Sequence, residues 1–367
     1  PLMRSLPGEA EVLWVRGQPR IERDGQPPVL ALLGATVPPG ATITTAAGEG
    51  LRLRLSTGSD VTVGEQARLT LVELRTLAGG TVRRTLLDAT RGRVETTVAP
   101  STHPAQRHQV KTPVVTATVR GTEFRVAVDD GGVSTEVTEG ALGLARDAEA
   151  LALDAGFGVR ARPGAALPAP ARLLPAPALA RLQTIGTRLP VRVTWPGVPG
   201  ATAYRVRVLP ETDPVPIIEQ RVPAADVSWP DLPDGTYRIV VRAIDADGLE
   251  GIDATASFTV DARPLPPLVQ GATGGRPVYG DSLELQWTRP AGVERFDVQV
   301  ARDGDFSTPV AERTGLSDVG VSLPLPPGRY AWRLASRLGE DRGPWSDALA
   351  VELRARPAGG PPPDAQV

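Results

Sequence analysis

Apolar and polar residues alternate over short stretches along most of the chain, and turn residues separate these stretches. Leu51–Leu55 places leucines at every second position, and Glu123–Val128 places Phe124, Val126 and Val128 on one face. Alternation with a period of two predicts β-strands that have one apolar face. Because no long stretch shows the helical period, we predict an all-β protein.

Residues 110–140 show the pattern most clearly. A β-branched segment, Val114–Val119, precedes two alternating segments, Glu123–Val128 and Ser134–Thr138. The sequence Asp-Asp-Gly-Gly at 129–132 predicts a tight turn between them, because glycine adopts positive φ at no steric cost. We therefore expect a strand followed by a β-hairpin.

The junction before this hairpin is not explained by alternation alone. Residues 119–124, VRGTEF, place a glycine between strong strand formers, which indicates a bulge or a closely packed backbone. Together with the hairpin, this stretch resembles the signature of FecR domains. We expect Arg120, Gly121, Thr122 and Phe124 to be structural residues of a strand junction, with ligand binding as the alternative.

Other segments agree with this resemblance in order along the chain. The separated positions that fit the family pattern are Gly17, Gly34, Gly40, Thr44, Leu53, Leu55, Gly58, Ser59, Val61 and Val63. Further strands are predicted at Glu11–Arg16, Pro19–Arg23, Leu30–Leu33, Val61–Val63, Leu69–Leu74, Thr81–Leu87, Arg91–Glu95 and Leu151–Val159. The segments at 69–74 and 81–87 form a hairpin around Gly79-Gly80. The resemblance implies a FecR-type β domain of short antiparallel strands over residues 8–160.

Residues 161–188 are rich in proline and alanine, which disfavours regular structure and predicts a semi-rigid linker. One helical turn is allowed at 178–183. The linker separates the FecR-type domain from a C-terminal half of different organisation.

This C-terminal half contains an internal repeat. Trp195 precedes Tyr204 by nine residues in the first copy, and Trp287 precedes Phe296 by nine in the second. The copies resemble fibronectin type III modules, so we predict two β-sandwiches of the fibronectin type III or immunoglobulin-like class. They are placed at 189–261 and 262–355, followed by a disordered tail at 356–367.

Most of the aromatic residues in these copies are expected in the sandwich cores. The expected core residues are Trp195, Tyr204, Tyr237, Trp287, Phe296, Tyr330 and Trp332. Trp229 and Trp345 lie near loops or edges, so they are the candidates for aromatic residues that face a ligand.

The composition excludes several classes of function. The chain has 367 residues, no cysteine and a formal net charge of −2, so disulfides and thiolate chemistry are excluded. The basic residues are spread along the chain, so nucleic-acid binding is not expected. Lys111 is the only lysine among 40 basic residues, a skew that we attribute to a GC-rich genome.

Groups suited to catalysis are scarce. His103 and His108 lie in a predicted polar loop with no third ligand nearby, so we expect no metal site, and nothing in the sequence indicates a cofactor. The paired aspartates at 129–130, 245–247 and 303–305 are explained by turn geometry. No serine lies in a nucleophile elbow. We therefore expect that the protein is not an enzyme.

The resemblance to FecR domains and fibronectin type III modules implies a non-catalytic protein of the bacterial cell envelope, periplasmic or at the cell surface. Its expected partners are an envelope protein or a glycan such as peptidoglycan, bound through sandwich loops and strand edges, with self-assembly through the same edges as a further mode. No apolar stretch approaches the roughly 18 residues of a membrane span. Because the chain begins at Pro1, we expect that a signal peptide has been removed. The resemblance to proteins that combine a FecR domain with sandwiches implies a LysM module before Pro1.

The alternative is regulation. FecR-family sensors relay a signal to a sigma factor through a cytoplasmic segment and one membrane span. A precursor with such a span would favour signalling, whereas a signal peptide with a LysM repeat would favour a scaffold.

Overall fold

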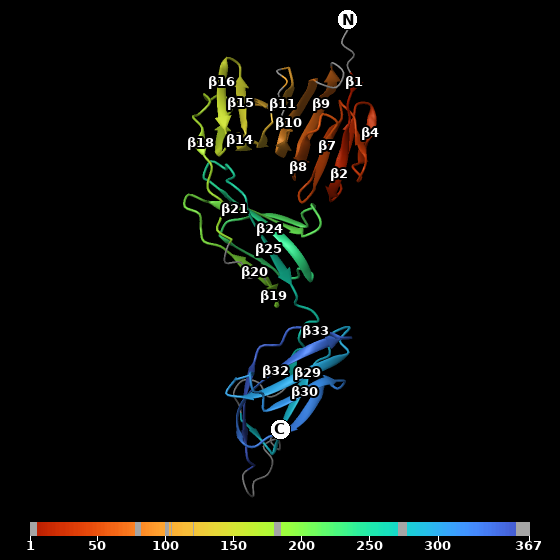
Figure 1. Cartoon of the computed structure of the whole chain (residues 1–367), viewed down its shortest axis with the longest axis vertical. Coiled ribbons are helices and arrows are strands. Elements are labelled where there is room, and N and C mark those ends of the chain that lie inside the picture. The colour runs from red at the N-terminus through yellow and green to blue at the C-terminus, as the bar shows by residue number, and fades with distance from the viewer. Residues whose placement is uncertain are drawn as a thin grey trace. The chain divides into compact units, whose positions relative to one another are not determined.

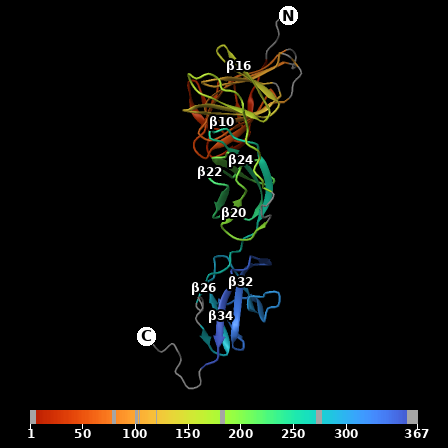
Figure 2. The same cartoon turned by 90° about the vertical axis from the view of Figure 1, so that its left-hand side faces the viewer.

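The structure is a computed structural model that describes residues 6–77, 82–99, 103, 105–119, 121–179, 185–270 and 277–356. Every regular element in these residues is a β-strand, so the all-β prediction is confirmed. The chain forms two compact units, drawn in Figures 1 and 2. Unit 1 comprises residues 1–182, 193–227 and 236–258, and unit 2 comprises 183–192, 228–235 and 259–367.

Strands follow one another along the chain, and most of them are short. The FecR-type part contains β1 (Leu6–Pro7), β2 (Ala10–Arg16), β3 (Arg20–Arg23), β4 (Gln26–Leu30), β5 (Thr36–Val37), β6 (Thr42–Thr44), β7 (Gly50–Leu55), β8 (Asp60–Val63), β9 (Arg68–Leu77), β10 (Val82–Thr97), β11 (Arg107–Lys111), β12 (Thr116–Val119), β13 (Glu123–Asp129), β14 (Gly132–Glu139), β15 (Ala141–Arg146), β16 (Glu149–Asp154), β17 (Phe157–Ala161) and β18 (Ala171–Arg172). The first repeat contains β19 (Ile185–Gly186), β20 (Val191–Thr194), β21 (Ala203–Pro210), β22 (Ile218–Val222), β23 (Asp226–Trp229), β24 (Gly235–Ile244) and β25 (Ala254–Val260). The second contains β26 (Val269–Gln270), β27 (Val278–Tyr279), β28 (Ser282–Trp287), β29 (Arg295–Arg302), β30 (Ala311–Leu316), β31 (Gly320–Pro324), β32 (Gly328–Leu338), β33 (Asp341–Arg342) and β34 (Leu349–Arg354).

Strands β2–β18 form two layers around one hydrophobic core. Layer 1 runs β4-β3-β6-β9-β10-β11-β12-β15-β16, and layer 2 runs β5-β2-β7-β8-β10-β13-β14-β17-β18. The long strand β10 belongs to both, since residues 82–91 pair with β9 and residues 92–97 pair with β13. Through β10 the pairings join both layers into one barrel-like structure. Leu53, Leu69 and Phe124 are among the fully buried side chains of its core.

The predicted hairpin is confirmed. Strands β13 and β14 pair antiparallel, and Asp129 lies opposite Gly132, whose φ is 137°. The polar face of this hairpin is nevertheless buried, because Arg125 and Glu136 are only 3% and 1% exposed. A local pattern of period two therefore places the strands correctly but does not show what covers their polar side.

Two predicted strands have the wrong bounds. The apolar run at 30–33 follows a strand rather than forming one, because β4 (Gln26–Leu30) ends where the run begins. The segment at 151–159 is two strands, β16 and β17, because Gly156 turns the chain with φ 83°. The predicted tip at 79–80, residues 180–183 of the predicted helical turn and residues 357–367 of the predicted tail lie outside the described residues.

Part of the predicted linker packs on unit 1. Strand β18 pairs with β17, Leu173 is buried, and the carbonyl of Leu174 accepts a hydrogen bond of 2.9 Å from the amide of Ile252. The proline-rich segment is therefore in contact with both the FecR-type part and the loop between β24 and β25.

Strands β26–β34 of unit 2 form a β-sandwich. One sheet runs β26-β28-β31 and the other contains β34-β32-β29-β30, which is an immunoglobulin-like arrangement of strands. The hydroxyl of Tyr330 donates to the carbonyl of Pro326 at 2.6 Å, the hydrogen bond of a tyrosine corner. The second predicted sandwich is therefore confirmed.

The repeated aromatic pairs occupy equivalent places. The rings of Trp195 and Tyr204 meet edge to face with centroids 5.3 Å apart, and those of Trp287 and Phe296 do so at 5.5 Å. The predicted core aromatic residues are all buried: Trp195, Tyr204, Tyr237, Trp287, Phe296, Tyr330 and Trp332. In unit 1, strands β25-β24-β21-β22 form the sheet that we call sheet 3.

Gly92 provides a test of the layer geometry. Its φ is 76° and a Cβ would lie 2.4 Å from the Cα of Ala67, whereas Gly25, with φ 70°, has no atom within 4 Å of such a Cβ. Gly92→Ala should therefore lower the free energy of unfolding by about 3 kcal/mol, from backbone strain and overpacking together. Gly25→Ala should lower the free energy of unfolding by only about 1 kcal/mol, because it introduces backbone strain without overpacking. Urea denaturation measures both, and equal losses would contradict the close packing of β10.

Candidate functional site

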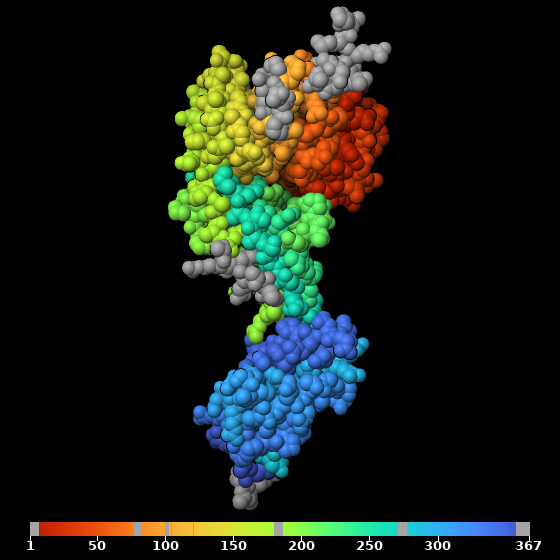
Figure 3. Space-filling view, viewed as in Figure 1, coloured from red at the N-terminus to blue at the C-terminus, as the bar shows by residue number. Residues whose placement is uncertain are grey.

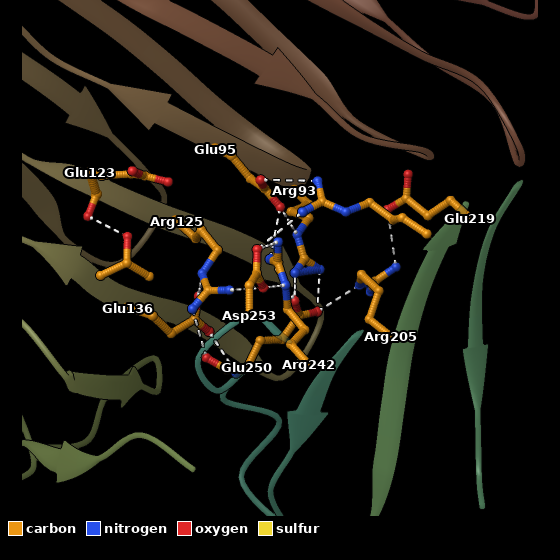
Figure 4. Close-up of polar contacts among 12 residues, drawn as sticks. Arg93, Glu95, Glu123, Arg125, Glu136, Arg205, Glu219, Arg242, Glu250 and Asp253 are labelled. Carbon is orange, nitrogen blue, oxygen red and sulfur yellow. Dashed lines mark hydrogen bonds and ion pairs between the residues drawn. The ribbon is translucent and has the colours of Figure 1, made fainter. Parts of the chain in front are cut away.

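Layer 2 of the FecR-type part contacts sheet 3 within unit 1, and Figure 3 shows green and teal residues of unit 1 packed against the red to yellow residues of the FecR-type part. On β10, Arg93 and Glu95 flank the buried Val94, and on β21, Arg205 and Arg207 alternate with core residues. Because the pleat sends successive side chains to opposite faces, the pattern that fills each core also directs these charges toward each other. A network of arginines and carboxylates results (Figure 4).

Glu250, in the loop between β24 and β25, is the centre of this network. Its side chain is 6% exposed and pairs with both terminal nitrogens of Arg93. It also accepts hydrogen bonds from Arg205 Nε at 2.8 Å and from Arg242 Nη1 at 3.2 Å. Its backbone amide donates to Glu136 Oε1 at 3.2 Å. The Glu250 carboxylate thus joins β10 of layer 2 to β21 and β24 of sheet 3, and the backbone amide of the same residue adds a contact with β14.

Glu95 and Asp253 form a second set of contacts across the same interface. Glu95 accepts from Arg242 Nη1 at 2.9 Å, Arg93 Nε at 3.2 Å and Arg207 Nη1 at 3.4 Å. Asp253 accepts from Arg242 Nη2 at 3.0 Å and Arg207 Nη2 at 3.3 Å. Arg242 therefore bridges carboxylates that come from both sides of the interface.

Arg125 of β13 anchors the loop that carries Glu250. Its Nη2 donates to the backbone carbonyls of Glu250 at 2.9 Å and Gly251 at 2.8 Å, and its Nε lies 3.6 Å from Glu136 Oε2. This explains why the polar face of the predicted hairpin is buried: it contacts sheet 3 and its loops.

Three further ion pairs lie toward the edges. Glu219 of β22 accepts from Arg16 Nη2 at 3.0 Å and lies 3.5 Å from Arg205 Nη1. Arg162 pairs with Asp247 at 3.0 Å, and both of these side chains are exposed. The interface therefore has a buried ionic centre and a solvated rim.

Burial and pairing with arginines shift the pKa of Glu95 in opposite directions. Burial alone would raise the pKa of this carboxyl, but Arg242, Arg207 and Arg93 hold the pKa well below its usual range. The carboxylate thus remains ionised and is already shared by three guanidinium groups. Such an arrangement suits a structural ion network better than proton transfer.

The predicted signature residues lie at a strand junction. Gly121 has φ 73°, Thr122 is buried and its hydroxyl donates to the carbonyl of Ala141 at 2.7 Å, and Phe124 belongs to the barrel core. A register shift between Glu123 and Phe124 forms the expected bulge. Arg120 lies outside the described residues.

The two candidate ligand-facing tryptophans differ. The prediction for Trp229 is wrong, because β23 directs Val227 and Trp229 inward and leaves Trp229 only 5% exposed. Trp345 is half-buried, and the guanidinium carbons of Arg333 and Arg342 lie 4.8 and 5.0 Å from its ring centroid. A ligand-binding role for Trp345 stays a prediction.

The predicted loop position is wrong for His108, which lies on β11 (Arg107–Lys111) and is 2% exposed. Its ring contacts Phe124 edge to face at 6.3 Å, and burial lowers the pKa of His108 to about 3. The alternation of β11 turns His108 into the core, which a loop assignment could not show. His103 Nδ1 accepts a hydrogen bond of 3.2 Å from the amide of Ala105.

Metal-binding clusters and membrane-spanning helices are both absent from the described part of the chain. It holds no group of three or more histidine, cysteine, aspartate or glutamate side chains placed to bind a metal. It also holds no helix with the length and apolar character of a membrane span.

The network residues were not among the candidates predicted from the sequence. The available signal is a charge that alternates with core residues on strands far apart in the chain, as in Arg93-Val94-Glu95 and Arg205-Val206-Arg207. The same alternation is usual for strands whose polar face is in water. Only the contact between the two sheets distinguishes the two cases.

Comparison with known families supports the FecR assignment for part of the chain. Residues 41–143 match the family model described as FecR protein, so the FecR-type domain is confirmed over this stretch. No curated protein sequence matches the chain.

Similar solved structures are distant. A candidate anti-sigma factor from Parabacteroides distasonis is 15% identical with a TM-score of 0.30, over 36% of this chain and 59% of that one. The chain thus spans less than two thirds of that protein's length. The chicken CNTN1 FN1–FN3 domains are 16% identical with a TM-score of 0.26, over 63% and 98% of the two chains. A segment of chicken tenascin with two fibronectin type III domains is 15% identical with a TM-score of 0.26, over 49% and 99%.

Loss of the Glu250 charge should destabilise the protein. Glu250→Gln removes the charge that Arg93, Arg205 and Arg242 share, so we expect the free energy of unfolding to fall by about 3–5 kcal/mol. Asp247→Asn, which breaks the exposed pair with Arg162, is the matched control and should cost less than about 1 kcal/mol. Urea denaturation followed by circular dichroism measures both, and a similar small loss in each variant would show that the network does not hold the interface.

Burial of His108 should make the stability of the protein depend on pH. His108 stays neutral in the folded protein down to a pKa of about 3, whereas in the unfolded chain it gains a proton below its ordinary pKa of 6.5. The unfolded state therefore binds more protons between these values, and stability rises with pH by up to about 1.4 kcal/mol per pH unit. From pH 6.5 to 5.0, the free energy of unfolding should fall by about 1.5 kcal/mol more in the wild type than in His108→Asn.

His103→Asn is the control for this pH experiment and should keep the wild-type dependence. Denaturation curves at the two pH values provide the measurement. If His108→Asn and the wild type lose the same stability, the imidazole is not held neutral by burial.

Proposed function

We propose that the chain is a non-catalytic protein of the bacterial cell envelope that acts as a binding scaffold for a partner protein. The observation that carries this proposal is the network around Glu250, which joins layer 2 to sheet 3. Separating the two faces would leave several arginines and carboxylates without partners, which is strongly unfavourable. The FecR-type part and sheet 3 therefore behave as one rigid body, as a scaffold requires.

A surface segment supports a protein partner. Val29, Leu30, Leu32 and Leu33 are 50%, 46%, 63% and 73% exposed, and we call them the 29–33 segment. Single exposed aliphatic residues are ordinary, but four within five residues are a local concentration of exposed apolar side chains, and interaction sites commonly have such a concentration. They lie at the end of β4 in the FecR-type part (Figure 1).

The strand at the edge of layer 1, β4, indicates how a partner protein would bind. Strand β4 pairs with β3 and contains the consecutive prolines at 27 and 28. Proline has no amide hydrogen, which weakens pairing with an added strand. The 29–33 segment thus favours docking through side chains over the strand addition expected from sequence.

Binding assays with separate baits test this proposal. We expect the wild-type protein to be retained by immobilised envelope proteins more than by purified peptidoglycan or capsular glycan. The double variant Leu32→Ser/Leu33→Ser should lower this retention about tenfold or more, because burial of two leucine side chains contributes about 3 kcal/mol. Both residues are exposed, so the fold should be unaffected.

Val310→Ser, at a valine of unit 2 that is 44% exposed, is the control and should bind like the wild type. Retention by a glycan alone, or retention that the double variant does not change, would contradict binding through the 29–33 segment.

The family match over residues 41–143 favours a second function, regulation of a sigma factor from the periplasm. Transcription from a sigma-factor-dependent reporter distinguishes the two functions. Deletion of the gene changes reporter output under the regulatory function and leaves it unchanged under the scaffold function. Fractionation of cells, with the protein detected in periplasmic or surface fractions, tests the envelope location that both functions require.

A further inference from the structure

We infer that unit 1 contains a binding pocket for a small organic anion that carries a carboxylate or phosphate group. A cavity of about 340 Å³ lies beside the Glu250 network, between strands of layer 2 and sheet 3. This volume is at the lower end of the range for small-molecule sites. Its charged lining consists of five arginines, which include Arg207 and Arg238, and three carboxylates, Glu95, Glu219 and Asp253.

The charge of the lining is the first argument. Five arginines face three carboxylates, which leaves an excess of two positive charges. The charged residues that pair with these lining groups do not cancel the excess, because they comprise three arginines and two carboxylates: Arg125, Arg205, Arg242, Asp60 and Glu250. The cavity is therefore suited to a negatively charged ligand.

The state of the carboxylates is the second argument. Glu95 is paired with three arginines, and Glu219 with two. Burial alone would raise the pKa of Glu219, but Arg205 and Arg93 are among the arginines that lower it. The negative charges at the cavity are thus already compensated, and they do not oppose an incoming anion.

Arg238 provides the third argument. This half-buried side chain of β24 lines the cavity, and it makes no hydrogen bond or ion pair with any residue in the described part of the chain. Arg207 Nε is likewise buried without an acceptor there. Guanidinium donors thus exceed the acceptors around the cavity, and a carboxylate or phosphate matches the geometry of a guanidinium group.

The remaining lining indicates the kind of anion. Trp14, Val63, Leu209, Pro214, Pro216 and Val240 form an apolar wall. Such a wall can contact the carbon skeleton of a ligand, whereas a bare inorganic ion would leave it wet. An acidic sugar or a sugar phosphate has both features, an anionic group for Arg238 and carbon atoms for the wall.

Isothermal titration calorimetry of the full chain tests this inference with three probes: D-glucuronate, glucose 6-phosphate and neutral D-glucose. We expect at least one of the charged probes to bind, and glucose to bind much more weakly. Binding of glucuronate alone identifies a carboxylate ligand, and binding of glucose 6-phosphate alone identifies a phosphate ligand.

Arg238→Gln should weaken the charged probe about tenfold, as expected for loss of one hydrogen bond to a charged group. It should keep the wild-type denaturation midpoint, because the side chain has no partner in the described residues. Arg192→Gln, at an exposed arginine of β20, is the control and should bind like the wild type.

The inference is overturned if neither charged probe binds, if glucose binds equally well, or if Arg238→Gln binds like the wild type. None of these results bears on the 29–33 segment or on the stability of the Glu250 network, so failure of the pocket is distinguishable from failure of the proposed function.

Discussion

Burial of charged side chains between two sheets is unfavourable unless each charge has partners of opposite sign. Between layer 2 and sheet 3, the positive charges that pair with the buried carboxylates come almost entirely from arginine. A planar guanidinium group can donate to several carboxylates at once, as Arg242 does to Glu95, Glu250 and Asp253, whereas a lysine ammonium is a single point charge. The near absence of lysine from the chain, whatever its genomic origin, is compatible with this kind of interface.

The network changes what the FecR-type part can present to other molecules. Antiparallel layers commonly have one solvated face, but sheet 3 covers the part of the outer face of layer 2 that carries Arg125 and Glu136, so these two side chains are not available to a partner. The two binding sites that we propose, the 29–33 segment at the edge of layer 1 and the arginine-lined cavity beside the network, do not depend on these two side chains.

The two repeats show how one framework supports different surfaces. The aromatic pair in each core is retained at the same spacing. In the first repeat, outward residues such as Arg205 pair with carboxylates of the interface. In the second, Arg337 pairs with Asp297 within its own sheet at 2.8 Å, and Arg333 stacks on Phe306. The residues that the two copies share thus specify their cores. The outward-facing residues differ, according to where each copy lies in the chain.

The sequence by itself determined the all-β class, the hairpin at 123–139 and the aromatic cores, because these depend on alternation, turn chemistry and spacing among residues close in the chain. Only the tertiary structure decided that Glu95 and Arg242 meet, that Trp229 and His108 are buried, and that the run after β4 is exposed. Alternating polar positions are the same whether they face water or another sheet, and the pairs that cross from layer 2 to sheet 3, such as Glu95–Arg242 and Arg93–Glu250, join residues more than 100 positions apart in sequence. The physical reason is that burial of a charged face depends on long-range contacts, which a local pattern does not contain.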